Sequence, residues 1–285
     1  MTLSTDLFPQ FVGTTSDLSN EDYHAGPGVS KSHLDTVSRS PYLYYRKHLD
    51  PNRPPNPTSV RLLQGTLAHC AILEPDEFRK RYLVGPDANR NTKEWKAAEA
   101  AATELGKTLI KPDEHSTAMR QAEAVRQIKD VADLFAIGKP EVSAYWRDEE
   151  TQLLCKCRPD WVHDCNDTGV ILVDVKTTQD ASPQVFRNSV AKWRYHVQNA
   201  WYADGYAKAS GLNVLAFVFV AVEMDWPYAA SAMILDDEAI GEGRAEYNRN
   251  LKAIADCAKS NNWPGYSEGI EMISLPKWAF NYGAM

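Results

Sequence analysis

Two aspartates and a lysine are the residues of this chain best suited to chemistry. Asp160 ends a polar stretch, and Asp174 and Lys176 interrupt the apolar run of residues 170–173. Two carboxylates that share one site repel each other unless a cation lies between them, and oxygen ligands suit a hard divalent ion such as Mg²⁺. This set favours metal-assisted hydrolysis of a phosphodiester, in which Lys176 positions or helps to deprotonate the attacking water. A buried salt bridge of Asp174 with Lys176 or Arg158 is an equally good explanation of the same residues.

The alternation of side chains along a strand predicts where these groups point. In a strand from Gly169 to Thr177, Asp174 and Lys176 share a face, because successive side chains point to opposite faces. The segment from Gln152 to Trp161 alternates as well and carries Asp160. A turn signal at residues 166–169 separates the two segments, so we expect them to pair as a hairpin-like unit that brings the charged groups together.

Composition excludes several classes of protein. A chain of 285 residues is long enough for one sizeable core. Its net charge of −7 argues against a protein that coats nucleic acid, although a local basic groove is compatible with it. We find no apolar run of membrane-spanning length and no leader at Met1, and we expect a cytoplasmic protein with no membrane partner. The five cysteines include no C-x-x-C pair, so we expect free thiols.

The N-terminal half is predicted to be mostly helical. Residues 1–29 are interpreted as a flexible entry to a single domain over residues 30–280. In its 30–137 part, Ser30 caps a helix, residues 50–57 form a proline-rich linker, and a helix from Thr58 to Leu73 carries His69. A lone histidine in an apolar helix is more often a hydrogen-bonded core residue than a ligand. Two further helices are expected, around 92–106 and 112–135.

The second half is predicted to hold the sheet. Its 138–260 part has three antiparallel strands, at 141–147, 152–161 and 169–177, a central apolar strand at 214–222 and a neighbour at 228–235. A helix or lid opens at 180–189, and a helix over 193–210 places Gln198 and Tyr202 on one face. Asp236 caps a last helix that runs to about residue 260, and residues 261–285 form a packed, irregular C-terminal wrap.

Other catalytic motifs are missing from the sequence. It contains no glycine-rich phosphate loop, no G-x-S-x-G elbow, no H-E-x-x-H helix and no internal repeat. Nucleoside triphosphate hydrolysis, serine hydrolysis and zinc proteolysis therefore lack the residues they need.

Four elements in order resemble a known nuclease pattern: His69 on an upstream helix, Arg158-Pro159-Asp160, Asp174-Val175-Lys176 and Gln198-x-x-x-Tyr202. The pattern resembles the PD-(D/E)XK nuclease superfamily in its RecB-like form. Over residues 28–280 the chain is most similar to the RecE type, exodeoxyribonuclease VIII, through short matches such as Ser30-Lys31-Ser32 and Trp263-Pro264-Gly265-Tyr266. The resemblance implies an α/β (α+β) fold with a restriction-endonuclease-like core: a central mixed β-sheet flanked by helices, preceded by a helical region.

The resemblance also implies roles for single residues. His69, Asp160, Asp174 and the carbonyl of Val175 would bind the metal, and Lys176 would orient the water and stabilise charge. Glu141 matches a glutamate on the first core strand that assists the metal site, although an exposed charge at a strand end would look the same. Gln198 and Tyr202 match the motif that approaches the DNA end or the scissile phosphate.

The activity implied is exonucleolytic. The family degrades linear double-stranded DNA from 5′ to 3′ with Mg²⁺, two ions being expected and Mn²⁺ a possible substitute, and leaves 3′ single-stranded tails for an annealing protein. It also implies a homo-oligomeric ring, a trimer or tetramer, with a basic channel for the DNA. We assign the following residues to that channel: Arg39, Lys47, Arg158, Arg187, Lys192 and Arg194. A solvated helix face is an alternative explanation of the same charges.

Two other functions remain open on the sequence. One is another RecB-like nuclease, CRISPR-associated with an iron–sulfur cluster or linked to a helicase; the cluster version needs cysteines that flank the core. The other is a DNA-end binder without activity that has kept the fold. Catalytic positions are filled in this chain, which favours the enzyme.

Overall fold

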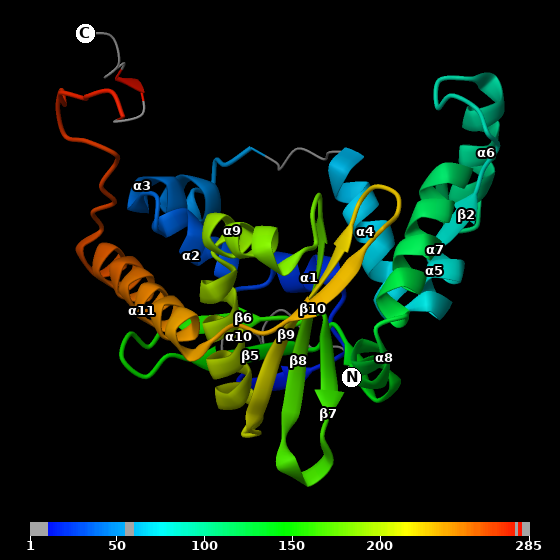
Figure 1. Cartoon of the computed structure of the whole chain (residues 1–285). Helices are drawn as coiled ribbons and strands as arrows, with labels where there is room; N and C mark the ends of the chain where they lie inside the picture. Colours follow the sequence, from blue (N-terminus) through cyan, green and yellow to red (C-terminus); the bar gives the residue numbers. More distant parts are fainter. Residues whose placement is uncertain (1–10, 55–59, 277–278, 281–285) are drawn as a thin grey trace, which may run out of the picture.

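A mixed five-stranded sheet forms the centre of the protein (Figure 1). The computed structural model describes residues 11–54, 60–276 and 279–280. The strand order is β10-β9-β8-β7-β4. The middle strand β8 (Val170–Thr178) pairs in parallel with β9 (Val214–Glu223) and antiparallel with β7 (Trp161–Asp164). The edge strands β10 (Ala230–Met233) and β4 (Gly138–Pro140) are antiparallel to their neighbours. The predicted α/β fold class with a central mixed sheet is confirmed.

The two faces of this sheet are covered by different helices. Ile171, Val173 and Val175 of β8 pack in one core with helices α4 (Val60–Leu73), α7 (Pro112–Arg126) and α8 (Lys129–Ala136). Val170 and Leu172 pack in the other core with α9 (Pro183–Trp193), α10 (Tyr195–Ser210) and α11 (Asp237–Ser260). The predicted alternation along this strand is therefore confirmed, and it places Asp174 and Lys176 on the α10 face.

A smaller sheet lies beside the α10 face. Its order is β1-β5-β6, from β1 (Gly13–Thr15), β5 (Ser143–Arg147) and β6 (Leu154–Cys157), all antiparallel. Gly205 of α10 lets the helix approach β5 closely, since a Cβ at that position would lie 2.2 Å from the Trp146 ring. The remaining N-terminal elements are α1 (Asn20–Ala25), α2 (Lys31–Val37), α3 (Pro41–Tyr44) and a π-helical turn over Tyr45–Leu49.

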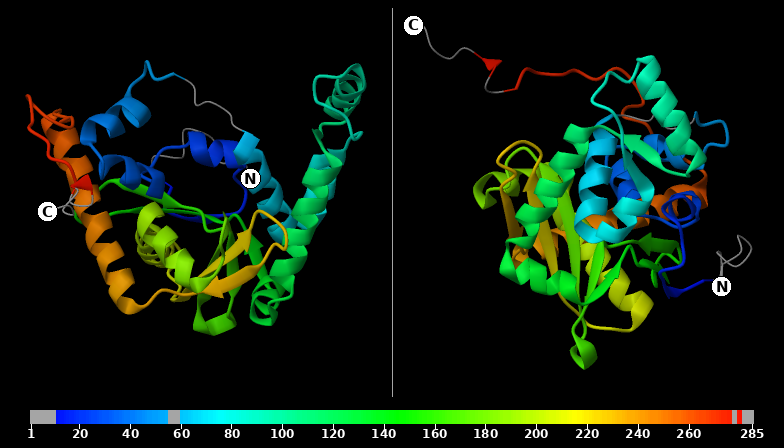
Figure 2. Two further views of the ribbon diagram at one scale, coloured as in Figure 1. Left: turned by 45° about the horizontal axis from the view of Figure 1, so that its top comes forward. Right: turned by 90° about the vertical axis from the view of Figure 1, so that its right-hand side faces the viewer.

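Two segments project from this body (Figure 2). One contains α6 (Lys93–Glu104) and the parallel pair β2 (Tyr82–Val84) and β3 (Thr108–Ile110), reached through α5 (Pro75–Arg81), with its own small core around Trp95. The other is the C-terminal segment. Trp263 packs on Tyr44, but Ile270 and Met272 are almost fully exposed. The prediction of a packed wrap is therefore wrong for residues 265–276, which are exposed.

Several predicted boundaries also need correction. The strand expected over 152–161 is split, because the chain leaves β6 at Cys157 and enters the other sheet at Trp161. Of these two parts, only β7 pairs with β8, and a short 3-10 helix (Asn166–Thr168) joins β7 to β8. The helix expected over 112–135 is interrupted between α7 and α8. Within the predicted flexible entry, β1 pairs with β5 and α1 follows it, while residues 1–10 and much of the proline-rich linker lie outside the described residues.

The remaining predicted elements are confirmed within a few residues. β9 lies inside the sheet with β10 beside it, and Asp236 caps α11 by accepting a hydrogen bond from the amide of Ala239. Within the described ranges, no helix combines the length and apolar character needed to cross a bilayer.

Candidate active site

The register of β7 and β8 brings Asp160 and Asp174 together. The pairs run from Asp164↔Val170 to Trp161↔Val173, so Asp160, one residue before β7, lies opposite Asp174. The Asp160 Oδ2 atom accepts a hydrogen bond of 2.7 Å from the backbone amide of Val175. Burial, followed by the neighbouring Asp174 carboxylate, raises the pKa of Asp160 to about 6. The hairpin predicted from the sequence thus exists, with β7 alone as its first strand.

Asp174 is held from two sides. It is a buried residue, 2 % exposed, and Gln198 Nε2 of α10 donates to its Oδ1 atom over 2.5 Å. Its Oδ2 atom lies 2.5 Å from Lys176 Nζ. That oxygen is buried and accepts no hydrogen bond of good geometry from the described residues. The cation beside this buried carboxylate oxygen is the Lys176 ammonium.

Lys176 is the cation of this cluster. Its Nζ lies 4.7 Å from the centre of the Tyr195 ring, at the start of α10. Burial disfavours the charged amine, but the carboxylates of Asp174 and Asp160 overcome this effect and raise the pKa of Lys176. The side chain is therefore an ammonium at neutral pH, directed at the two acids and away from packed hydrocarbon.

His69 approaches Asp160 from the opposite face of the sheet. It lies on α4, and its Nδ1 atom is 3.5 Å from Asp160 Oδ2. The side chain is one-third exposed, so it borders solvent on one side and the buried carboxylate on the other. The imidazole predicted as a ligand therefore faces one of the two predicted acids.

Glu141 lies next to this cluster but in no strand. It stands between β4 and β5 in a left-handed conformation with φ of 52°, and its amide donates to the Asp160 carbonyl over 3.0 Å. The placement of Glu141 on the first core strand was therefore wrong, because such a backbone cannot continue a strand. Burial, followed by the Asp160 carboxylate, raises the pKa of Glu141 to about 8. A non-glycine residue in this conformation beside two acids is typical of a functional site.

The remaining predicted site residues divide into buried and exposed ones. Tyr202 is partly buried against Phe217, with ring centres 6.0 Å apart. Arg158 is buried and bound to protein oxygens, including Ser143 Oγ at 2.6 Å, which disfavours its predicted contact with DNA. Four of the basic residues assigned to a DNA channel are exposed, and their role stays a prediction: Arg39, Lys47, Arg187 and Lys192.

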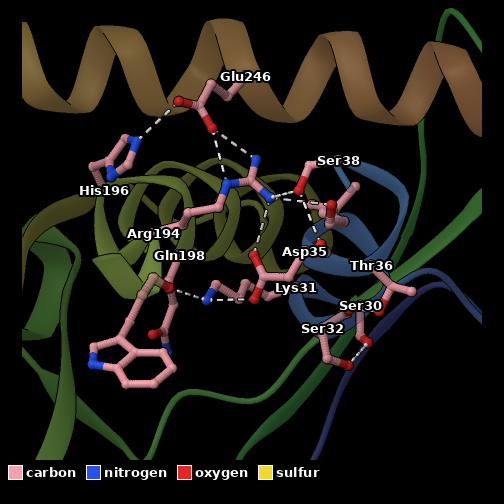
Figure 3. A network of polar contacts seen from close by, with 12 residues as sticks. Ser30, Lys31, Ser32, Asp35, Thr36, Ser38, Arg194, His196, Gln198 and Glu246 are labelled. Atoms are coloured by element: carbon pink, nitrogen blue, oxygen red, sulfur yellow. Dashed lines mark hydrogen bonds and ion pairs between the residues drawn. The ribbon is translucent and has the colours of Figure 1, made fainter. Parts of the chain in front are cut away.

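Arg194 lies in a network that joins α2, α10 and α11 (Figure 3). Its guanidinium donates to Glu246 Oε2 at 2.7 Å and 3.0 Å, to Asp35 Oδ1 at 3.1 Å and to Ser38 Oγ at 2.8 Å. These partners occupy its donors, so we interpret Arg194 as a structural residue in place of a DNA contact. Lys31 belongs to the same network through Asp35 at 2.7 Å.

The donor set fits a hard divalent cation, although the side chains are not arranged around one. In the described part of the chain, no three acidic, histidine or cysteine side chains converge as a ready metal site. The reason is that Asp160 is turned to the Val175 amide and Asp174 to Lys176 and Gln198. The buried Asp174 Oδ2, the Asp160 carboxylate and the His69 imidazole are nevertheless oxygen and nitrogen donors on one cluster, and rotations of the side chains would free them.

Two nearby residues were missed in the sequence. Tyr195 places its ring against the Lys176 amine, and Lys31 donates to the Trp193 carbonyl over 2.7 Å at the end of α9. Tyr195 could have been found, because it precedes Gln198 by three positions and so shares its helix face. Lys31 could not have been found from the sequence, because only the tertiary structure brings α2 to this site.

Comparisons with known proteins agree with this geometry. Residues 30–276 match the family described as "PDDEXK-like domain of unknown function (DUF3799)". No curated protein matches the chain. A solved structure described as "Putative exonuclease" from Eubacterium rectale aligns with a TM-score of 0.54 and 13 % identity, over 90 % of this chain and 97 % of that one.

A second solved structure is an alkaline exonuclease (LHK-Exo) from Laribacter hongkongensis. It aligns at 14 % identity over 68 % of this chain and 96 % of that one, but its TM-score of 0.27 carries no argument. At such identities the Eubacterium rectale structure supports the fold alone. The family match covers most of the chain, and its description agrees with the acids and lysine found on β7 and β8. The chain belongs to the PDDEXK-like DUF3799 family and thus to the PD-(D/E)XK superfamily.

Proposed function

We propose that the protein is a metal-dependent exodeoxyribonuclease of the RecE type, which degrades linear double-stranded DNA from 5′ to 3′ and leaves 3′ single-stranded tails. One observation carries the proposal: Asp160, Asp174 and Lys176 lie together on β8 and at the start of β7, and His69 of α4 lies next to Asp160. A buried cluster with two acids and one amine is unfavourable for folding alone, which supports a role in chemistry.

We assign a separate role to each residue of the cluster. Bound divalent ions, Mg²⁺ by preference, would supply an activated water and stabilise the leaving oxygen. Asp160, Asp174 and His69 would hold these ions. The Lys176 ammonium would orient the water and neutralise charge that develops on the phosphate. Gln198 would fix the rotamer of Asp174, since its amide already donates to Oδ1.

Several parts of the proposal come from the resemblance. The 5′ to 3′ direction, the ring of three or four copies and the annealing protein that would receive the 3′ tail are inferred from RecE-type enzymes. The description of the Eubacterium rectale structure as a putative exonuclease agrees with the proposed activity and gives no direction of digestion. The five free cysteines are spread over four places, with two in β6 and one each in α4, the β7–β8 turn and α11, which disfavours the iron–sulfur alternative.

Digestion of three DNA substrates tests the proposal. Purified protein with Mg²⁺ is given linear duplex labelled at either 5′ or 3′ end and a covalently closed circle. We expect loss of 5′ label as nucleotides or short fragments, survival of the circle and complete inhibition by a chelator. Asp174→Asn keeps the side-chain volume and should reduce turnover by about 10³-fold while DNA binding persists. Wild-type protein that binds DNA but does not digest it would favour a DNA-end binding protein. Full activity of Asp174→Asn would contradict the proposed metal mechanism.

A further inference from the structure

The aromatic ring of Tyr195 makes a contact with Lys176 for which the proposed chemistry gives no reason. The Lys176 Nζ atom lies over this ring, 4.7 Å from its centre, and 2.5 Å from Asp174 Oδ2. An ammonium over the face of an aromatic ring is attracted by the negative potential of that face. The Lys176 ammonium is therefore held by an aromatic ring as well as by an acid.

Two phenylalanines support the Tyr195 ring. Its centre lies 5.8 Å from that of Phe186 on α9 and 5.6 Å from that of Phe219 on β9, and both pairs are stacked with planes 28° apart. Phe186 and Phe219 are buried, and a closely packed core resists their displacement. Phe219 is also the residue that pairs with Asp174 in the register of β8 and β9. The ring is thus fixed to the strand pair that carries the site.

The backbone before Tyr195 is fixed as well. Arg194 has a left-handed conformation with φ of 55° and forms the corner between α9 and α10. Just before this corner, Lys31 of α2 donates to the Trp193 carbonyl over 2.7 Å. The Lys31 Nζ atom also lies 5.9 Å from the centre of the Tyr195 ring. Contacts from α2, α9 and β9 therefore determine where the ring lies.

The Lys176 side chain needs a support that does not depend on the acids. A lysine has a flexible four-carbon stem, so its ammonium can occupy several positions. In the structure, Asp174 holds this ammonium. In the proposed function, Asp174 and Asp160 would turn toward a divalent ion, and their hold on Lys176 would weaken. The contact with the Tyr195 ring is independent of the rotamers of the two acids.

We propose that Tyr195 is a positioning residue, whose ring keeps the Lys176 ammonium directed at the reacting phosphate when the acids bind a metal. This inference rests on the proposed nuclease function. The ring performs the role and the hydroxyl does not, because the ammonium lies over the ring. Tyr195 acts through Lys176 and needs no contact of its own with the metal or the DNA.

Three substitutions test the role of the ring. Tyr195→Phe keeps the ring and its stacking, whereas Tyr195→Leu removes the ring and keeps an apolar side chain. Tyr206→Leu is the matched control for lost packing, because Tyr206 is a tyrosine near the other end of α10 that packs in the same core. Digestion of linear duplex with Mg²⁺ gives kcat and KM for each variant, at a temperature at which circular dichroism shows the variant to be folded.

The expected result is a loss of rate without a loss of binding. For Tyr195→Leu, kcat should fall about tenfold with little change in KM, because the ammonium is misplaced while contacts with DNA remain. Tyr195→Phe and Tyr206→Leu should keep the wild-type kcat. A folded Tyr195→Leu protein with the wild-type kcat would overturn the proposal. An equal loss in Tyr195→Phe would overturn it too, since the hydroxyl would then carry the effect.

A measurement without metal or DNA separates the positioning of Lys176 from the activity. A methylene group near the face of an aromatic ring has its proton resonances shifted upfield by the ring current. In protein with isotope-labelled lysine, Lys176→Met identifies the Lys176 signal by its loss. We expect an upfield-shifted signal in wild type and in Tyr195→Phe, and an ordinary lysine signal in Tyr195→Leu.

The two measurements distinguish failure of the positioning role from failure of the nuclease function. An active wild-type protein whose Lys176 signal is unshifted would overturn the positioning role alone. A wild-type protein that shows the shifted signal but digests no DNA would overturn the nuclease function, and the positioning role with it.

Discussion

Two clusters of opposite charges lie on either side of α10's first turn, and they are built differently. In the Arg194 network (Figure 3), two cations, Arg194 and Lys31, face two acids, Asp35 and Glu246. In the active-site cluster, two cations face three acids, because Glu141 lies beside Asp160 and Asp174 while Lys176 and Arg158 are the neighbouring bases. Acidic and basic groups are equal in number in the first cluster, whereas the acidic groups outnumber these bases in the second.

The pKa values of the acids follow this difference. Burial tends to raise the pKa of Glu246, but its hydrogen bonds with Arg194 and His196 prevail and lower it. At the active site the balance is reversed, since burial and mutual repulsion raise the pKa of Asp160 to about 6 and of Glu141 to about 8. An excess of closely spaced acids thus separates a site that could take up cations from a network that joins helices.

The largest effect is expected at Lys176. The change Lys176→Met removes the ammonium that faces both acids, and turnover on linear duplex should fall by about 10³-fold. Stability should fall too, by roughly 3 kcal/mol, because two buried carboxylates lose their cation. Single-turnover digestion and urea unfolding measure the two effects. A variant that loses stability but keeps its turnover would make this cluster a structural salt bridge like the Arg194 network.

Glu246→Gln is the matched change in the network. It removes the charge that Arg194 and His196 bind, and we expect a loss of about 1–2 kcal/mol in the free energy of unfolding. Turnover should change less than twofold, since Glu246 lies on α11 and contacts neither acid of the site. Urea unfolding at pH 7 and digestion assays at saturating DNA measure this. A loss of activity as large as that of Lys176→Met would show that the network belongs to the catalytic machinery.

Divalent ions should stabilise only one of the clusters. With Mg²⁺ at about 100 times its Kd, mass action adds about 2.7 kcal/mol, or a rise of several degrees in Tm. The Tm with Mg²⁺ should exceed the Tm with a chelator in the wild type and in Glu246→Gln. In Asp174→Asn the two Tm values should be the same. A Tm rise that survives in Asp174→Asn would place the ion elsewhere.

The smallest effect is a difference in the pH dependence of stability, measured in metal-free protein. The pKa of Glu141 is raised from 4.5 to about 8, so the stability it contributes is full below pH 4.5 and is lost as the pH rises to about 8. The pKa of Glu246 is lowered, so its contribution is present above pH 4.5 and is lost as the pH falls further. Glu141→Gln should therefore gain stability relative to wild type from pH 5 to pH 8. Urea unfolding measures the difference in unfolding free energy between Glu141→Gln and wild type. A difference of the same size at pH 5 and at pH 8 would contradict the raised pKa of Glu141.

Much of the fold could be predicted because it depends on local patterns. Period-2 alternation predicted which residues of β8 face each helix layer, and the Asp236 cap predicted the start of α11. Two of the errors share one cause. At Arg158 the chain passes from one sheet to the other, and at Glu141 it takes a left-handed turn. Both features are imposed by tertiary contacts that no local pattern contains.

The candidate reactive groups were proposed from the sequence itself, since Asp160, Asp174 and Lys176 occur with His69 in an order that resembles a nuclease pattern. Their electrostatic state was decided by the tertiary structure. Burial and the neighbouring carboxylates raise the pKa of Asp160 and Glu141. On α11, the hydrogen bond from Arg194 helps to lower the pKa of Glu246. The physical reason is that a charge interacts with everything within a few ångströms, and those neighbours come from segments far apart in the chain.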